Sequence, residues 1–135
     1  MTVTSAATTS SRRPSPATAP DALDRAYDSA ERVTAAWAKS FYFASRFLPI
    51  DKRRAVFALY DYCRHADNLV DMRGERSVDA VRADLRALGR AVRRLHAGGP
   101  SGDGRWLALG DTLQRHRVPL APLLDLLEGV AHDLA

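Results

Sequence analysis

Hydrophobic residues recur every three or four positions along most of the chain, which is the spacing of one face of an α-helix. The clearest series runs from Val78 to Leu95: Val78, Val81, Leu85, Leu88, Val92 and Leu95. Similar spacing predicts helices at 21–37, 51–71, about 105–117 and about 122–135. No segment alternates as a half-buried strand would, so the pattern predicts an all-α chain.

Polar residues mark where these helices should begin and end. Asp21, Asp51 and Ser77 each precede a periodic segment, and their side chains could cap the first turn of a helix. Glycine and proline dominate residues 98–104, which predicts a flexible loop. Residues 1–20 hold Ser, Thr, Ala and Pro with almost no large apolar side chain, so we expect a disordered tail and a packed part at 21–135.

Composition limits the function classes. Of 135 residues, 46% are hydrophobic and 27% are charged, and no apolar run approaches the ~20 residues of a membrane-spanning helix. The single cysteine, Cys63, excludes an internal disulfide and fits a reducing, cytoplasmic location. The net charge of +4 suits anionic ligands, a membrane surface or nucleic acid, and does not choose between them.

Five arginines gather on the predicted helix at 78–97. They are Arg82, Arg86, Arg90, Arg93 and Arg94. A solvated helix face is the default interpretation, and contact with anionic lipid headgroups at the membrane periphery is the alternative. No motif that reads bases lies nearby, so we expect no nucleic-acid partner.

The helix at 51–71 carries the most informative chemistry. Its apolar stripe consists of Val56, Leu59, Tyr60, Cys63, Ala66 and Val70. Asp67 falls near the middle of this stripe, and Arg64 and Asp71 flank it. Because an unpaired buried carboxylate is costly, an acid on an inward face indicates a functional role. His65 lies on the opposite side, where we expect a surface role.

The spacing of the two acids suits a metal ion. Asp67 and Asp71 lie one turn apart, about 6 Å along the axis, where two carboxylates repel each other unless a cation neutralises them. Mg²⁺ commonly takes one or two carboxylates together with substrate phosphates, and the Arg64 guanidinium can hold a phosphate by two hydrogen bonds. The residues therefore predict a Mg²⁺–diphosphate site in a helical cavity. The alternative is a solvated acid pair that forms an ion pair with Arg64.

The residues around this helix resemble the phytoene/squalene synthase family. Eight of the ten aromatic residues lie between Trp37 and Tyr62. The matching landmarks occur in order over about residues 30–135: Lys39-Ser40-Phe41, Leu48-Pro49, Arg53-Arg54-Ala55, Tyr60, Cys63-Arg64, Asp67, Asp71, Glu128-Gly129 and Asp133-Leu134. Asn68 departs from the second acid that is commoner in the family motif.

The resemblance implies an isoprenoid-synthase helical bundle and head-to-head condensation of two prenyl diphosphates, as in isoprenoid and carotenoid biosynthesis. It implies that Asp67 and Asp71 bind Mg²⁺ and that Arg64 grips diphosphate. Tyr60 would line the pocket near the ionising group. Ser40 and Phe41 would lie on a segment that closes over the substrate.

Two further motifs of the family do not occur in this sequence: a second acid-bearing helix of the type N-I-x-x-D, and a helix of the type Y-C-x-x-V-A-G. We therefore expect the chain to be truncated to about the first half of a catalytic domain and to make no hydrocarbon alone. Asp125 and Glu128 do not replace the missing acids, and we expect both to face solvent.

Several functions stay open at this point. The sequence Cys63-Arg64-His65-Ala66-Asp67 resembles carotenoid members of the family most closely, which favours a phytoene-type enzyme that uses geranylgeranyl diphosphate. A squalene or dehydrosqualene type would use farnesyl diphosphate. A non-catalytic helical module that binds diphosphate is a further alternative, and an unrelated helical interaction protein is the last.

Overall fold

Helices make up most of the described part of the chain, which in this computed structural model is residues 20–101 and 104–134. They are α2 (Pro20–Trp37), α3 (Lys39–Ser45), α4 (Ile50–Asp71), α5 (Val78–His96), the short 3-10 helix η1 (Gly104–Trp106), α6 (Leu107–Arg115) and α7 (Leu120–His132). The described residues contain no strand, which confirms the all-α prediction. The predicted tail lies outside the described residues apart from Pro20, so its disorder stays a prediction.

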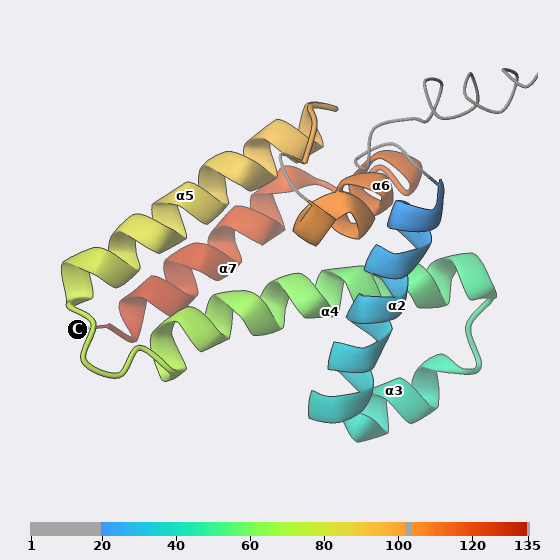
Figure 1. Ribbon diagram of the computed structural model, residues 1–135, viewed down its shortest axis with the longest axis horizontal. Helices are drawn as coiled ribbons and strands as arrows, with labels where there is room; N and C mark the ends of the chain where they lie inside the picture. The colour runs from blue at the N-terminus through green and yellow to red at the C-terminus, as the bar shows by residue number, and fades with distance from the viewer. Residues whose placement is uncertain (1–19, 102–103, 135) are drawn as a thin grey trace, which may run out of the picture.

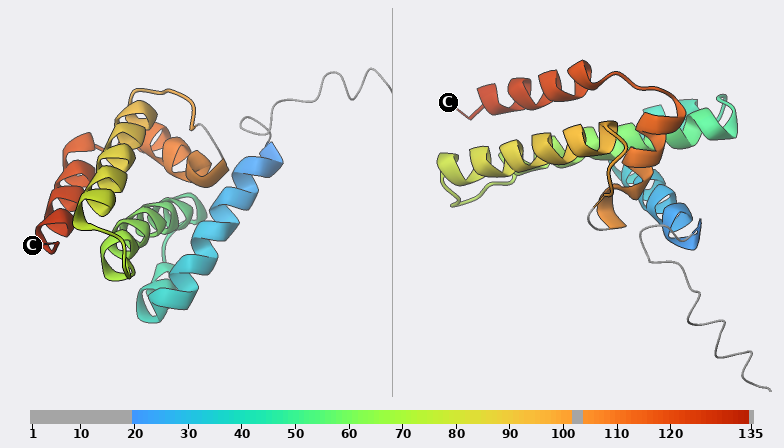
Figure 2. Two further views of the ribbon diagram at one scale, coloured as in Figure 1. Left: turned by 60° about the vertical axis from the view of Figure 1, so that its left-hand side comes forward. Right: turned by 90° about the horizontal axis from the view of Figure 1, so that it is seen from above.

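Three long helices form the body of the fold. α5 and α7 lie side by side, and α4 packs against both of them (Figure 1). α2 crosses α4 and also contacts α6, while α3 packs beside the C-terminal end of α2. Seen from above, α7 lies behind the layer of α4 and α5, and α2 crosses on the opposite side (Figure 2). The arrangement leaves one long side of α4 without a helix on top of it.

The helix ends follow the sequence in part. Ser77 caps α5 as predicted, since its side-chain oxygen accepts a hydrogen bond from the Ala80 N–H at 3.0 Å. The predicted caps at Asp21 and Asp51 are wrong, because α2 already includes Pro20 and α4 begins at Ile50 after Pro49. Proline has a fixed φ and no N–H, which suits the start of a helix. Both acids lie in the first turn instead, where their charge still favours the positive end of the helix.

The loop predicted at 98–104 begins where α5 ends. Gly98 has a φ of +87°, which only glycine adopts without strain. Its N–H donates to the Leu95 carbonyl at 3.0 Å, and the N–H of Gly99 donates to the Arg94 carbonyl at 2.8 Å. The last two predicted helices are confirmed with shifted bounds, because α6 ends at Arg115 and α7 runs from Leu120 to His132.

The hydrophobic core lies between α4, α5, α6 and α7. Five of the six apolar positions expected on α5 are buried there, and Val78 lies half-buried at the edge. Tyr62 on α4 is the largest fully buried side chain, with 1% of its surface exposed. Its hydroxyl donates to the Leu123 carbonyl at 2.7 Å, and its ring meets Trp106 edge-on at 6.2 Å. Tyr62 therefore joins α4 to η1 and α7.

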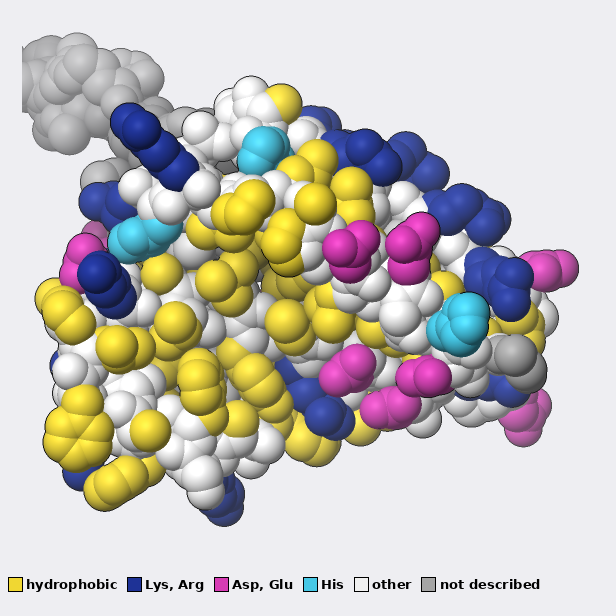
Figure 3. All heavy atoms as spheres, turned by 180° about the vertical axis from the view of Figure 1, so that it is seen from behind, with side chains coloured by type: hydrophobic (Ala, Val, Ile, Leu, Met, Phe, Trp, Pro, Cys, Tyr) yellow, Lys and Arg dark blue, Asp and Glu magenta, His cyan; other side chains and the backbone are white. Residues whose placement is uncertain are grey.

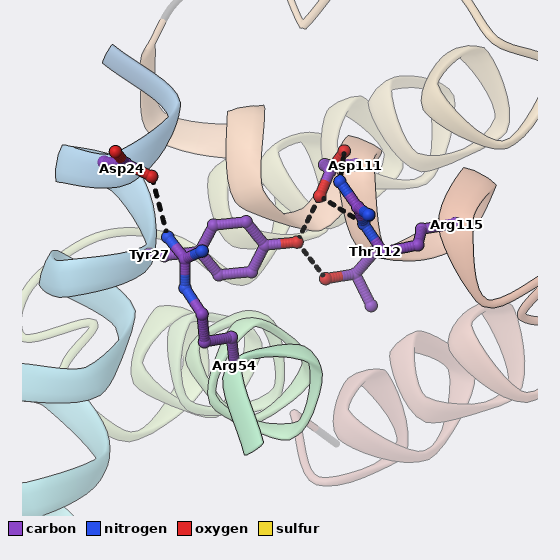
Figure 4. A network of polar contacts seen from close by, with 6 residues as sticks. All are labelled: Asp24, Tyr27, Arg54, Asp111, Thr112 and Arg115. Carbon is purple, nitrogen blue, oxygen red and sulfur yellow. Dashed lines mark hydrogen bonds and ion pairs between the residues drawn. The ribbon is translucent and has the colours of Figure 1, made fainter. Parts of the chain in front are cut away.

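A polar network fastens α2 to the rest of the fold (Figure 4). The Tyr27 hydroxyl donates to Asp111 Oδ2 at 2.6 Å and lies 3.0 Å from Thr112 Oγ1, both on α6. Arg54 on α4 lies 4.2 Å above the Tyr27 ring and pairs with Asp24 at 3.0 Å. Burial and the hydrogen bond to Asp111 raise the pKa of Tyr27 to about 12, so its hydroxyl stays protonated at neutral pH. The network fixes where the N-terminal half of α2 lies relative to α4 and α6.

Candidate functional site

The buried face of α4 overlaps only in part with the face that the apolar pattern indicated: Ala66 is fully buried, and Leu59, Cys63 and Val70 pack against the core from its edge. Phe57 is buried on the Arg64 side of the helix, and the other buried apolar residues are Tyr62 and the small residues Ala55, Ala58 and Ala66, which share one face. This face lies largely on the other side of the helix from Asp67. The reason is that α4 is apolar around most of its circumference, so the pattern could not say which side the core would occupy. Small side chains let α2 and α6 approach closely, and that contact decides the orientation.

The predicted stripe is therefore only partly covered. Val56, Leu59, Tyr60, Cys63 and Val70 are half-buried. Asp67 is half-buried beside them, and Asp71 is exposed at the end of the helix. The expectation that Asp67 lies within a packed, inward-facing stripe is wrong for the described residues. Asp67 instead belongs to an apolar face that is open along part of its surface.

Aromatic contacts connect this open face to α2 and α3. The Arg64 guanidinium carbon lies 4.0 Å from the centre of the Trp37 ring. One helical turn earlier on α4, the Tyr60 ring lies 6.2 Å from the ring of Phe41. The two contacts show that residues 37–41 run antiparallel to residues 60–64. Three of the predicted site residues, Phe41, Tyr60 and Arg64, therefore line one continuous strip.

Ser40 forms no hydrogen bond or ion pair with another side chain of the described residues. It lies in the first turn of α3 and is exposed, whereas Phe41 beside it exposes 43% of its surface. The segment that was expected to close over substrate is a short helix here. Other large apolar side chains around it are also exposed, namely Trp37, Phe43, Phe47, Leu48 and Ile50. Figure 3 shows a broad hydrophobic area on one face of the molecule, with acidic side chains beside it.

The two acids of the site are free of ion pairs. Neither Asp67 nor Asp71 forms a salt bridge or hydrogen bond with another side chain of the described residues, although both are described. Arg64, three residues before Asp67, stacks on Trp37 instead. The alternative in which the acids merely pair with Arg64 is therefore wrong. An arginine and two carboxylates lie on one face without neutralising each other.

The donor set fits a cation that needs few protein ligands. Within residues 20–101 and 104–134, no group of three or more His, Cys, Asp or Glu side chains is arranged to hold a metal ion. Two unpaired carboxylates one turn apart remain, and Mg²⁺ is commonly bound by one or two carboxylates with water and phosphate oxygens as the other ligands. Two buried atoms nearby, Arg64 Nε and Asn68 Oδ1, have no hydrogen-bond partner in the described structure.

His65 is not the surface residue that the sequence suggested. Its ring is half-buried and meets Trp106 edge-on at 5.2 Å. Burial and the neighbouring Arg105 lower the pKa of His65, against an opposite effect of Asp84. Asp61 beside it is buried and pairs with Arg105 at 3.1 Å, and burial raises the pKa of Asp61 despite that partner.

We expect His65 to make the fold less stable in mild acid. Its folded pKa is lower than the unfolded value of 6.5, so the unfolded chain binds more protons as the pH falls through 6.5, and stability falls with it. Urea unfolding at pH 7.5 and pH 5.5 measures this loss, and His65→Phe, which keeps a ring against Trp106, should reduce it. The raised pKa of Asp61 makes the fold more stable as the pH falls towards 3.8, and this opposite effect is the same in both proteins. An equal loss of stability in the variant would contradict the assignment to His65.

The arginines of α5 are exposed as predicted for a solvated face. Arg82, Arg86, Arg90 and Arg93 line a groove between α5 and α7, and none of them forms an ion pair with another described residue. Asp125 and Glu128 line the other side of the groove and are exposed, as expected. None of the described helices is both long and apolar enough to cross a bilayer.

Sequence reasoning missed the contact of Trp37 with Arg64. The sequence identifies Trp37 only as one member of a group of aromatic residues, with no indication of its partner. The available signal was the equal spacing of Trp37 to Phe41 and of Tyr60 to Arg64, four residues in each case. That spacing becomes informative only when the two segments are known to run antiparallel.

Comparison with known proteins gives consistent matches. A family model described as squalene/phytoene synthase matches residues 34–135. The chain is 40% identical over 122 residues to the 15-cis-phytoene synthase of Synechococcus elongatus. The alignment covers 90% of this chain and 38% of that protein. It is 37% identical over 114 residues to phytoene synthase 2, chloroplastic, of Solanum lycopersicum. That alignment covers 83% of this chain and 35% of the tomato protein. The chain thus spans little more than a third of the length of these relatives.

A solved structure has the same helical arrangement. The crystal structure of a dehydrosqualene synthase in complex with a ligand matches with a TM-score of 0.71 and 30% sequence identity. The match covers 83% of this chain and 38% of that one. The order and packing of the helices in the described residues therefore have a counterpart in a solved enzyme.

Proposed function

This chain belongs to the squalene/phytoene synthase family and has the helical fold of an isoprenoid synthase, and from that premise we propose that it carries part of the active site of a prenyltransferase. The reaction would join two prenyl diphosphates head to head. The observation that carries the proposal is the unpaired set of Asp67, Asp71 and Arg64 on an aromatic face of α4. A cation and an anionic group are the ligands that such a set can bind together.

We propose a distinct role for each residue. Mg²⁺ bound by Asp67 and Asp71 would supply positive charge to the departing diphosphate. The Arg64 guanidinium donates hydrogen bonds to the oxygens of that diphosphate. The rings of Tyr60 and Phe41 border the allylic group and stabilise its positive charge, while Ser40 lies next to Phe41 at the start of α3.

The chemistry follows from the loss of diphosphate. The bond between the first carbon and oxygen of one substrate breaks, and the electron pair leaves with the diphosphate. The double bond of the second substrate then attacks the allylic cation. Loss of a proton closes a cyclopropane ring. The second diphosphate then leaves with its electron pair, the resulting cation rearranges, and loss of a second proton gives the hydrocarbon. Water would capture the cation as an alcohol, and the described rings of this face do not exclude it by themselves, since Phe41 is 43% exposed.

Two candidate substrates have specific support. The names of the cyanobacterial and tomato relatives support the phytoene type, which would condense geranylgeranyl diphosphate. The solved dehydrosqualene synthase supports a farnesyl diphosphate enzyme, at the lower identity of 30%. We favour the phytoene type because the sequence relatives are more similar.

The test replaces the matching segment of the Synechococcus elongatus enzyme with this chain. We expect the chimera to convert geranylgeranyl diphosphate and Mg²⁺ to phytoene, measured by extraction and chromatography. Product from farnesyl diphosphate alone would favour the second candidate. An inactive but folded chimera, with Mg²⁺-dependent pyrophosphate binding by residues 1–135, would favour the non-catalytic module.

We also propose a cytoplasmic location with peripheral contact to anionic membranes. The unpaired arginines of α5 support it, because clustered basic side chains are attracted to anionic lipid headgroups. We expect the chain to float with phosphatidylglycerol vesicles, but not with phosphatidylcholine vesicles, and to detach at about 0.5 M NaCl. The double variant Arg86→Glu/Arg90→Glu should lose binding, whereas Arg25→Glu/Arg32→Glu on α2 should keep most of it. Equal binding to both lipids would contradict the proposal.

A further inference from the structure

The stacking of Arg64 on Trp37 is the feature of the site that the proposed reaction leaves unexplained. Trp37 is the last residue of α2, and 52% of its surface is exposed. A ring so exposed contributes little to the core, which contains the other tryptophan, Trp106, at 9% exposure. The guanidinium nevertheless lies 4.0 Å from the Trp37 ring centre, and Arg64 Nε is buried without a hydrogen-bond partner. The ring therefore takes the place of a polar partner for this arginine.

The alternative position for the Arg64 side chain lies on its own helix. Asp67 follows three residues later, and side chains at that spacing are neighbours on a helix surface. An arginine free to rotate would form an ion pair with Asp67. That pair would neutralise the carboxylate and occupy the guanidinium, so neither group would be available to a ligand. In the structure the two residues form no ion pair.

We propose that Trp37 is a positioning residue, which holds the Arg64 guanidinium on its ring and so prevents Arg64 from neutralising Asp67. The proposal rests on the proposed function in so far as a Mg²⁺–diphosphate ligand benefits from the separation. The tethering of α2 explains why Trp37 can do this. Tyr27, ten residues earlier on the same helix, is hydrogen-bonded to α6, so the ring of Trp37 has a fixed place beside α4.

The first measurement follows Arg64 without any ligand. In residues 1–135, the Arg64 side-chain N–H signal in a ¹H–¹⁵N NMR spectrum, assigned with Arg64→Lys, should be shifted upfield by the Trp37 ring. Trp37→Leu should abolish the shift, and Trp37→Tyr should retain most of it. Phe43→Leu is the matched control, because Phe43 is 58% exposed and also carries an arginine, Arg46, at 4.6 Å. An Arg64 signal that is the same in Trp37→Leu would overturn the proposal.

The second measurement distinguishes positioning from a structural role. Mg²⁺ is titrated into each protein, and binding is followed by the backbone amides of Asp67 and Asp71. We expect Trp37→Leu to weaken binding about fivefold and the control Phe43→Leu to leave it unchanged. Adding Arg64→Ala to Trp37→Leu should restore binding, because no guanidinium is left to occupy Asp67. Failure of this rescue would show that Trp37 acts in another way and would overturn the proposal.

Pyrophosphate with Mg²⁺ tests the proposed function separately. Wild type and Trp37→Tyr should bind it by calorimetry, and Trp37→Leu should bind it about fivefold more weakly. If no variant binds pyrophosphate while the NMR shift and the Mg²⁺ rescue are both observed, the diphosphate function fails and the positioning role stands. If wild type binds pyrophosphate and Trp37→Leu binds it equally well, the positioning role fails and the diphosphate function stands.

Discussion

Replacing Asp67 or Asp71 with alanine in the chimera is expected to lower hydrocarbon formation by about 100-fold or more. Positioning of the metal contributes several kcal/mol to the departure of diphosphate, and each 1.36 kcal/mol corresponds to about a factor of ten in rate. Neither acid contributes an ion pair to the described fold. The melting temperature should therefore change little while the rate collapses. Initial rates with geranylgeranyl diphosphate and circular-dichroism melts measure the two effects.

A matched acid provides the control for this experiment. Asp28 on α2 is exposed and forms no ion pair with another described residue, so Asp28→Ala should retain full activity. The rate of hydrocarbon formation by Arg64→Lys should lie between those of Asp67→Ala and Asp28→Ala, because an ammonium keeps the charge but not the planar fork of hydrogen-bond donors. Retention of the wild-type rate by Asp67→Ala would show that the metal assignment is wrong.

The largest expected effect on stability is at Tyr62. Tyr62→Ala removes a ring that is 1% exposed and packed against Trp106, and loss of a buried aromatic side chain commonly costs about 3–5 kcal/mol. We expect this decrease in the free energy of unfolding, measured by urea denaturation of residues 1–135 and followed by circular dichroism. A protein of this size is marginally stable, so the variant should be largely unfolded at 37 °C.

Tyr62→Phe separates the hydroxyl from the ring. It removes the hydrogen bond to the Leu123 carbonyl and should cost about 1 kcal/mol. Replacement of an exposed residue on the same chain, Arg94→Ala, should change the free energy of unfolding by less than about 0.5 kcal/mol. If Tyr62→Ala were as stable as Tyr62→Phe, the packing of α4 on η1 and α7 would be different from that described.

Local signals in the sequence predicted the helices well. Ser77 caps α5 and Gly98 ends it, and the apolar positions between them are buried in regular order. These features depend on residues only three or four positions apart, so they are readable from sequence. Asp51 shows the limit, since the preceding proline moved the helix start by one residue.

The orientation of α4 could not be predicted in the same way. Alanines on one side and larger apolar residues on the other both satisfy a helical period. The choice between the two faces depends on which one α2 and α6 contact, and those helices are distant in sequence. The Trp37–Arg64 contact could not be predicted from local sequence either, because it joins residues 27 positions apart and forms only when α2 and α4 are both in place. Asp67, Asp71 and Arg64 follow from helical spacing, and Ser40, Phe41 and Tyr60 from the family resemblance, and the roles of all six stay predictions.

The division of α4 into two faces has an evolutionary consequence. Ala55, Ala58, Tyr62 and Ala66 hold the fold together on one side, while Asp67, Asp71 and Arg64 lie off that packing surface. A mutation on the open side can change what this face binds while those packing contacts are kept. Selection can therefore act on the binding properties of this face and on folding almost independently, within a single helix of 22 residues. Such a helix can diverge in specificity by single substitutions, each of which leaves a folded protein.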